Sequence, residues 1–231
     1  MPRKTAAKTK VRTIENGFEL KDVKPLTDNQ ARVFEMYTQG KQLMLTGMAG
    51  TGKSFLALYL AFRDLVEGRI NSINIIRSTV PSRDMGFLPG TLKEKLAAYE
   101  DPYQQIVNEL FGRDDAWFIL CKKGYLNMMS TSYLRGVTYK NVAMIVDEVQ
   151  NCTLQELDTV ITRVGSGCRV MLCGDIKQND LLTGKNQSGL PLFEKIISQM
   201  PEFECVTFGI EDIVRSGLVR SYLMSKYKLG L

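Results

Sequence analysis

Histidine is absent from this 231-residue chain, and its absence removes several classes of chemistry. Catalytic triads that use histidine, histidine acid–base pairs and mixed cysteine–histidine zinc sites are all excluded. Any reaction must therefore rely on carboxylates, lysine, arginine, hydroxyl groups or a bound metal ion.

Cysteine is sparse and hydrophobic runs are short. The five cysteines are scattered without a C-x-x-C pair, which indicates reduced thiols rather than a disulfide framework. No apolar run approaches the ~20 residues that a membrane helix needs. The opening MPRKTAAKTK has no apolar segment after its charges, so it does not resemble a secretory signal. We therefore expect a cytoplasmic protein that is not bound to a membrane.

Acidic residues are absent from residues 1–12, which carry five basic ones: Arg3, Lys4, Lys8, Lys10 and Arg12. Such a segment is either a solvated tail or a basic arm that touches nucleic acid. The net charge of +5 is compatible with an anionic partner but does not require one. We predict a disordered tail over residues 1–20 and a folded domain over residues 21–231.

Short apolar segments alternate with helix-like segments through the rest of the chain. The predicted strands are residues 42–46, 73–77, 141–147, 169–173 and 204–208. The predicted helices are one starting near Thr27, in a capping box with Gln30, and those at 53–67, 153–163 and 191–199. This alternation favours a single α/β domain whose parallel sheet has helices on both faces. The less regular stretch 84–140 is compatible with an insertion.

The segment GMAGTGKS matches the phosphate-binding loop G-x-x-x-x-G-K-[ST], also called Walker A. Its glycines allow the backbone to curl so that N–H groups face phosphate oxygens, and the following helix presents its positive end. Lysine reaches the terminal phosphates, and the last hydroxyl binds Mg²⁺. The candidate nucleotide-binding residues are Gly47, Met48, Ala49, Gly50, Thr51, Gly52, Lys53 and Ser54.

In the segment MIVDEVQ, two adjacent acids, Asp147 and Glu148, stand at the end of an apolar run. Ligands of parallel sheets bind at the carboxyl ends of the strands, so Asp147 is expected to hold Mg²⁺ beside Ser54. Glu148 would then orient or deprotonate an attacking water. The alternative is a helix N-terminus, where two acids suit the helix dipole. A metal-binding acid followed by a catalytic glutamate favours hydrolysis of a nucleoside triphosphate.

The segment CGDIKQND follows the next predicted strand. Gly174 permits a turn there, and Asp175 and Gln178 would face the same phosphates. The alternative is an ordinary polar turn, which the spacing alone favours slightly.

Eight segments together resemble the PhoH family of P-loop ATPases, which are similar to the first motor domain of superfamily 1 helicases. The resemblance runs from about residue 24 to 222, through PLTDNQ, GMAGTGKS, GFLPG, SYLRGVTY, IVDEVQN, CGDIKQND, SGL and EDIVRSGLV. It implies a RecA-like P-loop NTPase domain with ATP and Mg²⁺ as cofactors. The chain is most similar in length to short, phage-type members, which would act in the host cytoplasm.

The resemblance also implies roles for three more residues. Gln30 matches a glutamine that recognises adenine, and Gln178 matches a glutamine of helicase motif III. Arg215 matches an arginine that contacts the γ-phosphate. Helicases supply such arginines from a second motor domain, which this chain is too short to contain. We therefore expect Arg215 to reach a neighbouring subunit's site in a homohexameric ring; the alternative is an ordinary surface arginine.

Nucleic-acid contacts are expected at the segment that begins at Arg77 and includes Arg83, and at Arg135. The family pattern after the second strand is altered here, because the proline has moved to position 81. From the helicase-like resemblance we expect binding of single-stranded RNA or DNA, with RNA favoured.

The leading hypothesis is therefore a Mg²⁺-dependent, oligomeric ATPase coupled to binding or remodelling of single-stranded nucleic acid. Lys53, Glu148, Gln178 and Arg215 are its candidate catalytic residues. The alternatives are a small-molecule kinase with the same phosphate loop and an RNA-binding or nuclease-associated module without motor activity.

Overall fold

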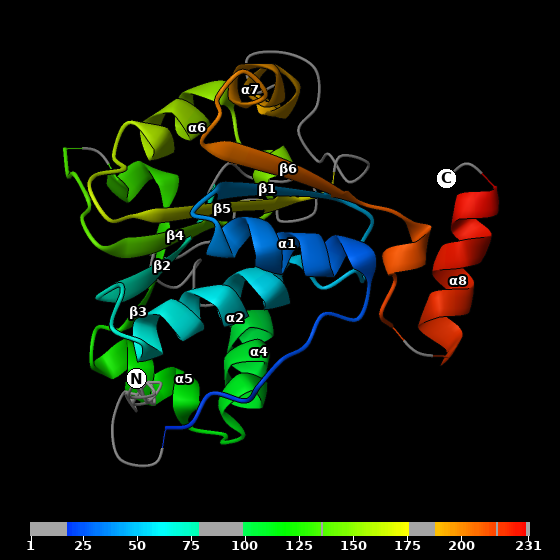
Figure 1. The fold of residues 1–231 in the computed structure, drawn as a ribbon, viewed down its shortest axis with the longest axis horizontal. Helices are drawn as coiled ribbons and strands as arrows, with labels where there is room; N and C mark the ends of the chain where they lie inside the picture. The colour runs from blue at the N-terminus through cyan, green and yellow to red at the C-terminus, as the bar shows by residue number, and fades with distance from the viewer. Residues whose placement is uncertain (1–17, 79–98, 135, 176–187, 216, 230–231) are drawn as a thin grey trace, which may run out of the picture.

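A parallel sheet of six strands organises the structure, in the order β3-β2-β4-β5-β1-β6 (Figure 1). The computed structural model describes residues 18–78, 99–134, 136–175, 188–215 and 217–229. The strands are β1 (Gln42–Gly47), β2 (Ser72–Arg77), β3 (Leu126–Ser130), β4 (Val142–Val146), β5 (Arg169–Gly174) and β6 (Phe203–Phe208). Because every pairing is parallel, the carboxyl ends of all six strands lie along one edge of the sheet.

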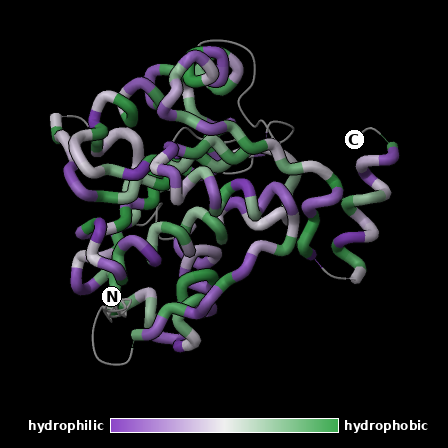
Figure 2. Tube along the Cα trace, viewed as in Figure 1, coloured by the Kyte–Doolittle hydropathy of each residue, from purple (hydrophilic) through white to green (hydrophobic). Residues whose placement is uncertain are grey.

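The central strands are buried on both faces, which explains their continuous apolar runs. All five residues of β4 are buried, and they alternate between two hydrophobic clusters. Ala143 and Ile145 belong to one cluster, whereas Met144 and Val146 belong to the other. Figure 2 shows hydrophobic residues concentrated along the strands, with hydrophilic and hydrophobic residues mixed along the helices.

Helices cover both faces of the sheet (Figure 1). One face carries α1 (Asp28–Thr38), α2 (Lys53–Val66), α4 (Asp101–Phe111) and α5 (Ala116–Lys122). The other face carries α6 (Leu154–Ile161) and α7 (Leu190–Ile197). Short 3-10 helices η1 (Thr131–Leu134), η2 (Val149–Asn151) and η3 (Ile210–Asp212) follow β3, β4 and β6.

Local sequence signals set several helix ends. Thr27 caps α1 by accepting a hydrogen bond from the Gln30 backbone N–H at 3.3 Å. A complete capping box between Thr153 and Glu156 starts α6. Gly68 follows the end of α2 with φ of +72°, a left-handed conformation that glycine adopts without a steric penalty.

All five predicted strands are present, but the sequence did not reveal β3. Strand β3 lies at one edge of the sheet, paired only with β2, and its three middle residues are half-buried. Its sequence LNMMS therefore shows neither a continuous apolar run nor a clear alternation. The described part of the stretch 84–140 thus contributes a strand and the two helices α4 and α5 to the domain.

The last helix, α8 (Gly217–Lys228), stands apart from the sheet and its covering helices (Figure 1). None of its described residues is buried. Exposed apolar side chains line it and the residue after it: Leu218, Val219, Tyr222, Tyr227 and Leu229. No helix in the described part of the chain combines the length and apolarity needed to cross a bilayer.

The contact between α2 and α4 depends on a pair of aromatic rings. The fully buried Phe62 meets Phe111 edge-on, with 5.0 Å between ring centroids.

We expect Phe62→Ala to lower the free energy of unfolding by about 3–5 kcal/mol, because it leaves a cavity under the helix that follows the phosphate loop. Denaturant unfolding measures this loss. Phe118→Ala is the matched control, because Phe118 is 65% exposed and its truncation should change stability by less than about 0.5 kcal/mol. Equal effects of the two changes would contradict the assigned packing.

Candidate nucleotide site

The phosphate loop connects the carboxyl end of β1 to the first residue of α2. Gly47, Gly50 and Gly52 all have positive φ values, of +122°, +78° and +85°. At Gly47 a side chain is also excluded by space, because a Cβ atom would overlap the Phe208 carbonyl oxygen of the neighbouring β6. The glycines therefore allow the backbone of the loop to curl, and Gly47 also allows β1 and β6 to approach closely.

The Lys53 ammonium lies inside the curl of this loop. Its Nζ donates hydrogen bonds to the carbonyl oxygens of Gly47 at 2.9 Å and Met48 at 2.7 Å. Burial lowers the pKa of Lys53, whereas the nearby acids Asp175 and Asp147 act in the opposite direction. The amine is thus held against the backbone of the loop.

Asp147, directly after β4, is brought next to Ser54. The Ser54 hydroxyl lies 3.0 Å from both carboxylate oxygens of Asp147, although the two residues are 93 positions apart. Asp147 is only 8% exposed and also accepts hydrogen bonds from the Glu148 N–H at 3.1 Å and the Tyr103 hydroxyl at 2.8 Å. A buried carboxylate with this many donors is held in one orientation.

The oxygen atoms of Ser54 and Asp147 fit Mg²⁺, which prefers hard oxygen ligands. The described residues contain no group of three or more histidine, cysteine, aspartate or glutamate side chains able to hold a metal ion. The chain thus offers a partial ligand set of the kind that Mg²⁺ completes with water and substrate phosphates.

Glu148 adopts a left-handed backbone conformation, with φ of +54° and ψ of +45°, which is uncommon for a residue other than glycine. Burial and the adjacent Asp147 raise the pKa of Glu148, while the positive charges of Arg77 and Lys53 oppose that rise. Its carboxylate accepts a hydrogen bond from the Gln150 side-chain amide. The acid is therefore aimed by both its backbone and a neighbouring side chain.

Gln150 links the ends of β4 and β5. It is 1% exposed, and its side-chain oxygen accepts a hydrogen bond from the Asp175 backbone N–H at 3.0 Å. Because β5 lies between β1 and β4, Asp175 sits between the phosphate loop and Asp147. No pattern in the sequence indicated a role for Gln150, although it belongs to the same MIVDEVQ segment. Tyr103 gave no sequence signal, because nothing in α4 marks which residue faces Asp147.

Gln30 approaches the phosphate loop from α1. Its side-chain oxygen accepts a hydrogen bond from the Leu26 N–H at 2.8 Å, and its amide donates to the Thr51 carbonyl at 3.2 Å. The predicted capping box is therefore only half formed, because the Gln30 side chain bonds to Leu26 rather than to the backbone N–H of Thr27.

These residues share one cavity of about 610 Å³. It is lined by Gln30, Gly50, Lys53, Ser54, Asp147, Glu148, Asp175 and Arg215, among others. Arg215 reaches it through η3 and Val214, whose N–H donates to the Gly50 carbonyl at 3.1 Å. Arg215 thus lines the cavity of its own chain, and the expected contact with a neighbouring subunit's site stays a prediction.

Only one of the predicted nucleic-acid residues can be described. The Arg77 guanidinium, at the end of β2, lies 4.3 Å from the centroid of the Tyr99 ring. Arg83, Arg135 and the candidate catalytic residue Gln178 lie outside the described residues, so their roles remain predictions.

The hydroxyl groups beside Arg77 already have a partner. Ser78 and Thr131 donate hydrogen bonds to the Glu156 carboxylate, at 2.7 and 2.6 Å. This carboxylate ties the ends of β2 and β3 to α6, so these two hydroxyls are not free phosphate donors.

The chain matches the family model described as PhoH-like protein over residues 22–227. It is 33% identical to the PhoH-like protein of Mycobacterium leprae over 203 residues, which cover 86% of this chain and 57% of the relative. It is 32% identical to Protein PhoH of Escherichia coli K12 over 218 residues, which cover 92% of this chain and 61% of the relative. The chain thus spans little more than half the length of these curated relatives.

Solved structures show the same fold at low sequence identity. The large terminase from a thermophilic bacteriophage superposes with a TM-score of 0.54 at 10% identity, covering 88% of this chain and 50% of that one. A further crystal form of that terminase, in complex with ADP, gives a TM-score of 0.51 at 11% identity, covering 87% and 50%. The expected fold class, a single RecA-like P-loop NTPase domain with a parallel sheet covered on both faces, is confirmed. The chain belongs to the PhoH-like protein family.

Proposed function

We propose that this protein hydrolyses ATP in a Mg²⁺-dependent reaction at the edge of the sheet where β1, β4 and β5 end. The observation that carries the proposal is the 3.0 Å contact between Ser54, the last residue of the phosphate-loop motif, and Asp147, at the end of β4. A phosphate loop next to an acid at a strand end is the arrangement by which P-loop enzymes hold a metal-bound triphosphate.

The polar side chains of the site then have distinct tasks. The Lys53 ammonium exchanges its bonds to the loop carbonyls for bonds to the β- and γ-phosphates. Ser54 and Asp147 supply oxygen ligands for Mg²⁺, and Tyr103 and the Glu148 N–H keep the Asp147 carboxylate in place. When bound, Mg²⁺ neutralises negative charge on the phosphates.

Glu148 is the proposed general base. The burial that raises the pKa of Glu148 makes its carboxylate a better proton acceptor for an attacking water. Its left-handed backbone and its bond to Gln150 support a fixed orientation toward the cavity. Preorganisation of this kind limits the reorganisation needed during the reaction.

Gln30 is the proposed contact for the adenine base. It lines the cavity beside the apolar side chains of Val23, Leu26 and Ile106, which suit a flat heterocycle. The cavity volume of about 610 Å³ lies within the usual range of roughly 300–1,000 Å³ for small-ligand sites. The fold match to a terminase that was solved with ADP supports an adenine nucleotide as ligand.

Arg215 is proposed to contact the γ-phosphate of the nucleotide held by its own chain. Its position in the same cavity as Lys53, and the bond between Val214 and Gly50, support a contact within the chain. This arrangement requires no second subunit for the arginine to act.

Single-stranded nucleic acid, with RNA favoured, is the proposed partner, and Arg77 is the described residue that we assign to it. The positive charge of Arg77 opposes the rise in the pKa of Glu148, which supports a coupling between the partner and hydrolysis. We also propose a homo-oligomer, with a hexamer as the expected form. The uncovered apolar side chains of α8 support a contact with another copy.

Substitution of the proposed base should separate binding from hydrolysis. We expect Glu148→Gln to lower the ATP hydrolysis rate by about 10²–10⁴-fold, because the amide cannot accept the proton, while nucleotide binding persists. Lys53→Ala should reduce both, and Glu35→Gln, at an exposed position of α1, should change neither. Phosphate release with ATP and Mg²⁺ as the only substrates measures the rate and also separates hydrolysis from a kinase reaction. Normal turnover by Glu148→Gln would refute the assignment of the base.

Removal of the Tyr103 hydroxyl should weaken the metal site. We expect Tyr103→Phe to raise the Mg²⁺ concentration needed for half-maximal nucleotide binding by about tenfold, because Asp147 loses an orienting donor. Calorimetric titration of ADP at several Mg²⁺ concentrations measures this shift. Tyr37→Phe is the matched control, since Tyr37 also donates from a buried hydroxyl to a carboxylate, that of Asp64, at 2.7 Å. A similar Mg²⁺ requirement in both variants would show that Tyr103 is only structural.

Mixing two inactive variants tests which chain's nucleotide Arg215 serves. If Arg215 acts within its own chain, a mixture of Arg215→Ala and Lys53→Ala subunits stays inactive, because every chain lacks one essential group. If it acts on a neighbour, some mixed interfaces combine an intact Lys53 with an intact Arg215, and hydrolysis recovers. We expect no recovery in the hydrolysis assay. Sedimentation of the mixture under the same conditions verifies that the subunits exchange.

A further inference from the structure

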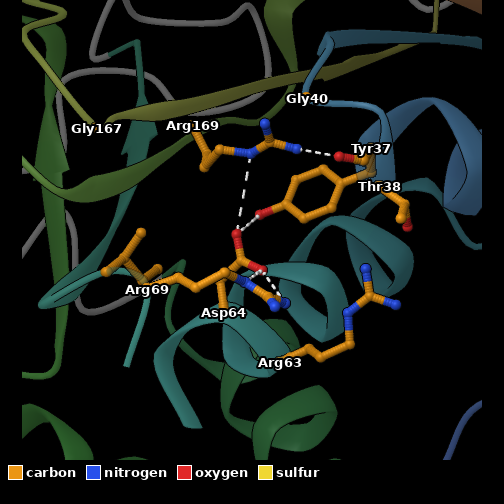
Figure 3. A pocket seen from close by; sticks show the side chains of 9 residues that line it. Tyr37, Thr38, Gly40, Arg63, Asp64, Arg69, Gly167 and Arg169 are labelled. Atoms are coloured by element: carbon orange, nitrogen blue, oxygen red, sulfur yellow. Dashed lines mark hydrogen bonds and ion pairs between the residues drawn. The ribbon is translucent and has the colours of Figure 1, made fainter. Parts of the chain in front are cut away.

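A second cavity, of about 220 Å³, lies at the edge of the sheet opposite to the nucleotide site. Gly40 precedes β1, Ile70 precedes β2 and Arg169 begins β5, so the cavity lies where these strands start rather than where they end. Figure 3 shows three arginines arranged around a tyrosine and an aspartate in its lining: Arg63, Arg69, Arg169, Tyr37 and Asp64.

The single aspartate in this lining is already satisfied. Asp64 is buried, and its carboxylate accepts hydrogen bonds from the Tyr37 hydroxyl at 2.7 Å and from Arg69 Nε at 2.8 Å. Arg69 also pairs with Glu67 at the rim. Two carboxylates thus offset two of the three arginine charges, so the cluster keeps one positive charge in excess.

Arg169 also has structural partners. It donates a hydrogen bond to the Tyr37 carbonyl at the end of α1, where a cation suits the negative end of the helix. Its guanidinium lies 3.9 Å from the centroid of the Tyr37 ring, and its Nε is 3.9 Å from the Asp64 carboxylate. The helix end and the ring therefore hold most of the Arg169 guanidinium, although its Nε, like that of Arg63, is buried without a hydrogen-bond acceptor.

Arg63 is the arginine without such a partner. Within the described residues it makes no hydrogen bond or ion pair, and its Nε is buried without an acceptor. Its guanidinium lies about 6 Å from the ring centroids of Phe34 and Tyr37, at 6.0 and 5.9 Å. A buried donor without an acceptor is costly, so a cation held in this way at the wall of a cavity indicates a missing anion.

We propose that this cavity binds a phosphate group, with Arg63 as its main donor and Arg69 and Arg169 as supporting charges. The planar guanidinium donates two parallel hydrogen bonds to phosphate oxygens, which would satisfy the free Nε. Arg63 and Arg169 both lie close to the Tyr37 ring, which leaves little room for a base to stack. The ligand class is therefore an oxyanion, either free phosphate or the backbone phosphate of a nucleic acid. The proposal does not depend on the function assigned to the nucleotide site.

Arginine side-chain NMR tests the proposal directly on the unmodified protein. The nucleotide site is first saturated with ADP and Mg²⁺, so that the phosphate loop cannot contribute. Inorganic phosphate is then titrated while the Nε–H signals are recorded, and a short single-stranded oligonucleotide is titrated in a second series. We expect a saturable shift of the Arg63 signal, which is assigned by its loss in Arg63→Gln. The signal of Arg163 is the internal control, because its Nε is also buried without an acceptor but it does not line the cavity.

The two titrations distinguish the sources of the phosphate. A shift with inorganic phosphate alone supports a free phosphate ligand, and a shift with the oligonucleotide supports a backbone contact. Arg63→Gln should weaken phosphate binding by about tenfold or more, the equivalent of losing one charge-assisted hydrogen bond, whereas Arg163→Gln should not. The proposal would be overturned if the chemical shift of the Arg63 Nε–H signal changed with neither ligand, or changed only together with that of Arg163.

Discussion

A buried carboxylate at the end of β4 is the interaction on which the rest of the site depends. Asp147 lies at the margin of the core, where an ionised group is tolerated only if it is surrounded by donors. Those donors come from Ser54 at the start of α2 and from Tyr103 in α4, which are far apart in the chain. The same carboxylate therefore fixes the position of two helices relative to the sheet, and the packing of the domain cannot be separated from the geometry of its site.

The strand order distributes the functional groups along one edge of the sheet. Strand β5 separates the phosphate loop of β1 from the acids of β4, so Asp175 lies between them. Gln150 bridges this spacing by bonding to both Glu148 and the Asp175 backbone. Residues that follow β1, β4 and β5 thus form one network of hydrogen bonds. A shift of any of these three strands would therefore displace groups that follow the other two.

Much of this arrangement could be predicted because it produces local patterns in the sequence, such as apolar runs and glycines at fixed spacing. The apolar run of β4 reflects burial on both faces, and the glycines of the phosphate loop reflect positive φ values and the contact with Phe208. Strand β3 could not be found, because an edge strand with half-buried residues leaves no periodic signal. Tyr103 and Arg63 could not be found either. Their importance comes from the side chains across from them, and one sequence does not contain that information.

Among the helices that the structure describes, α8 is the one without a buried residue. Its backbone amides are therefore protected from solvent exchange mainly by the helix itself, since no core must open before the helix frays. Opening of α8 should cost far less free energy than opening of α2, in which 10 of 14 residues are buried. Arg215 lies just before α8, and its neighbour Val214 is bonded to Gly50 of the phosphate loop. This wall of the nucleotide cavity therefore connects a helix that we expect to open locally to the loop that begins the well-buried helix α2.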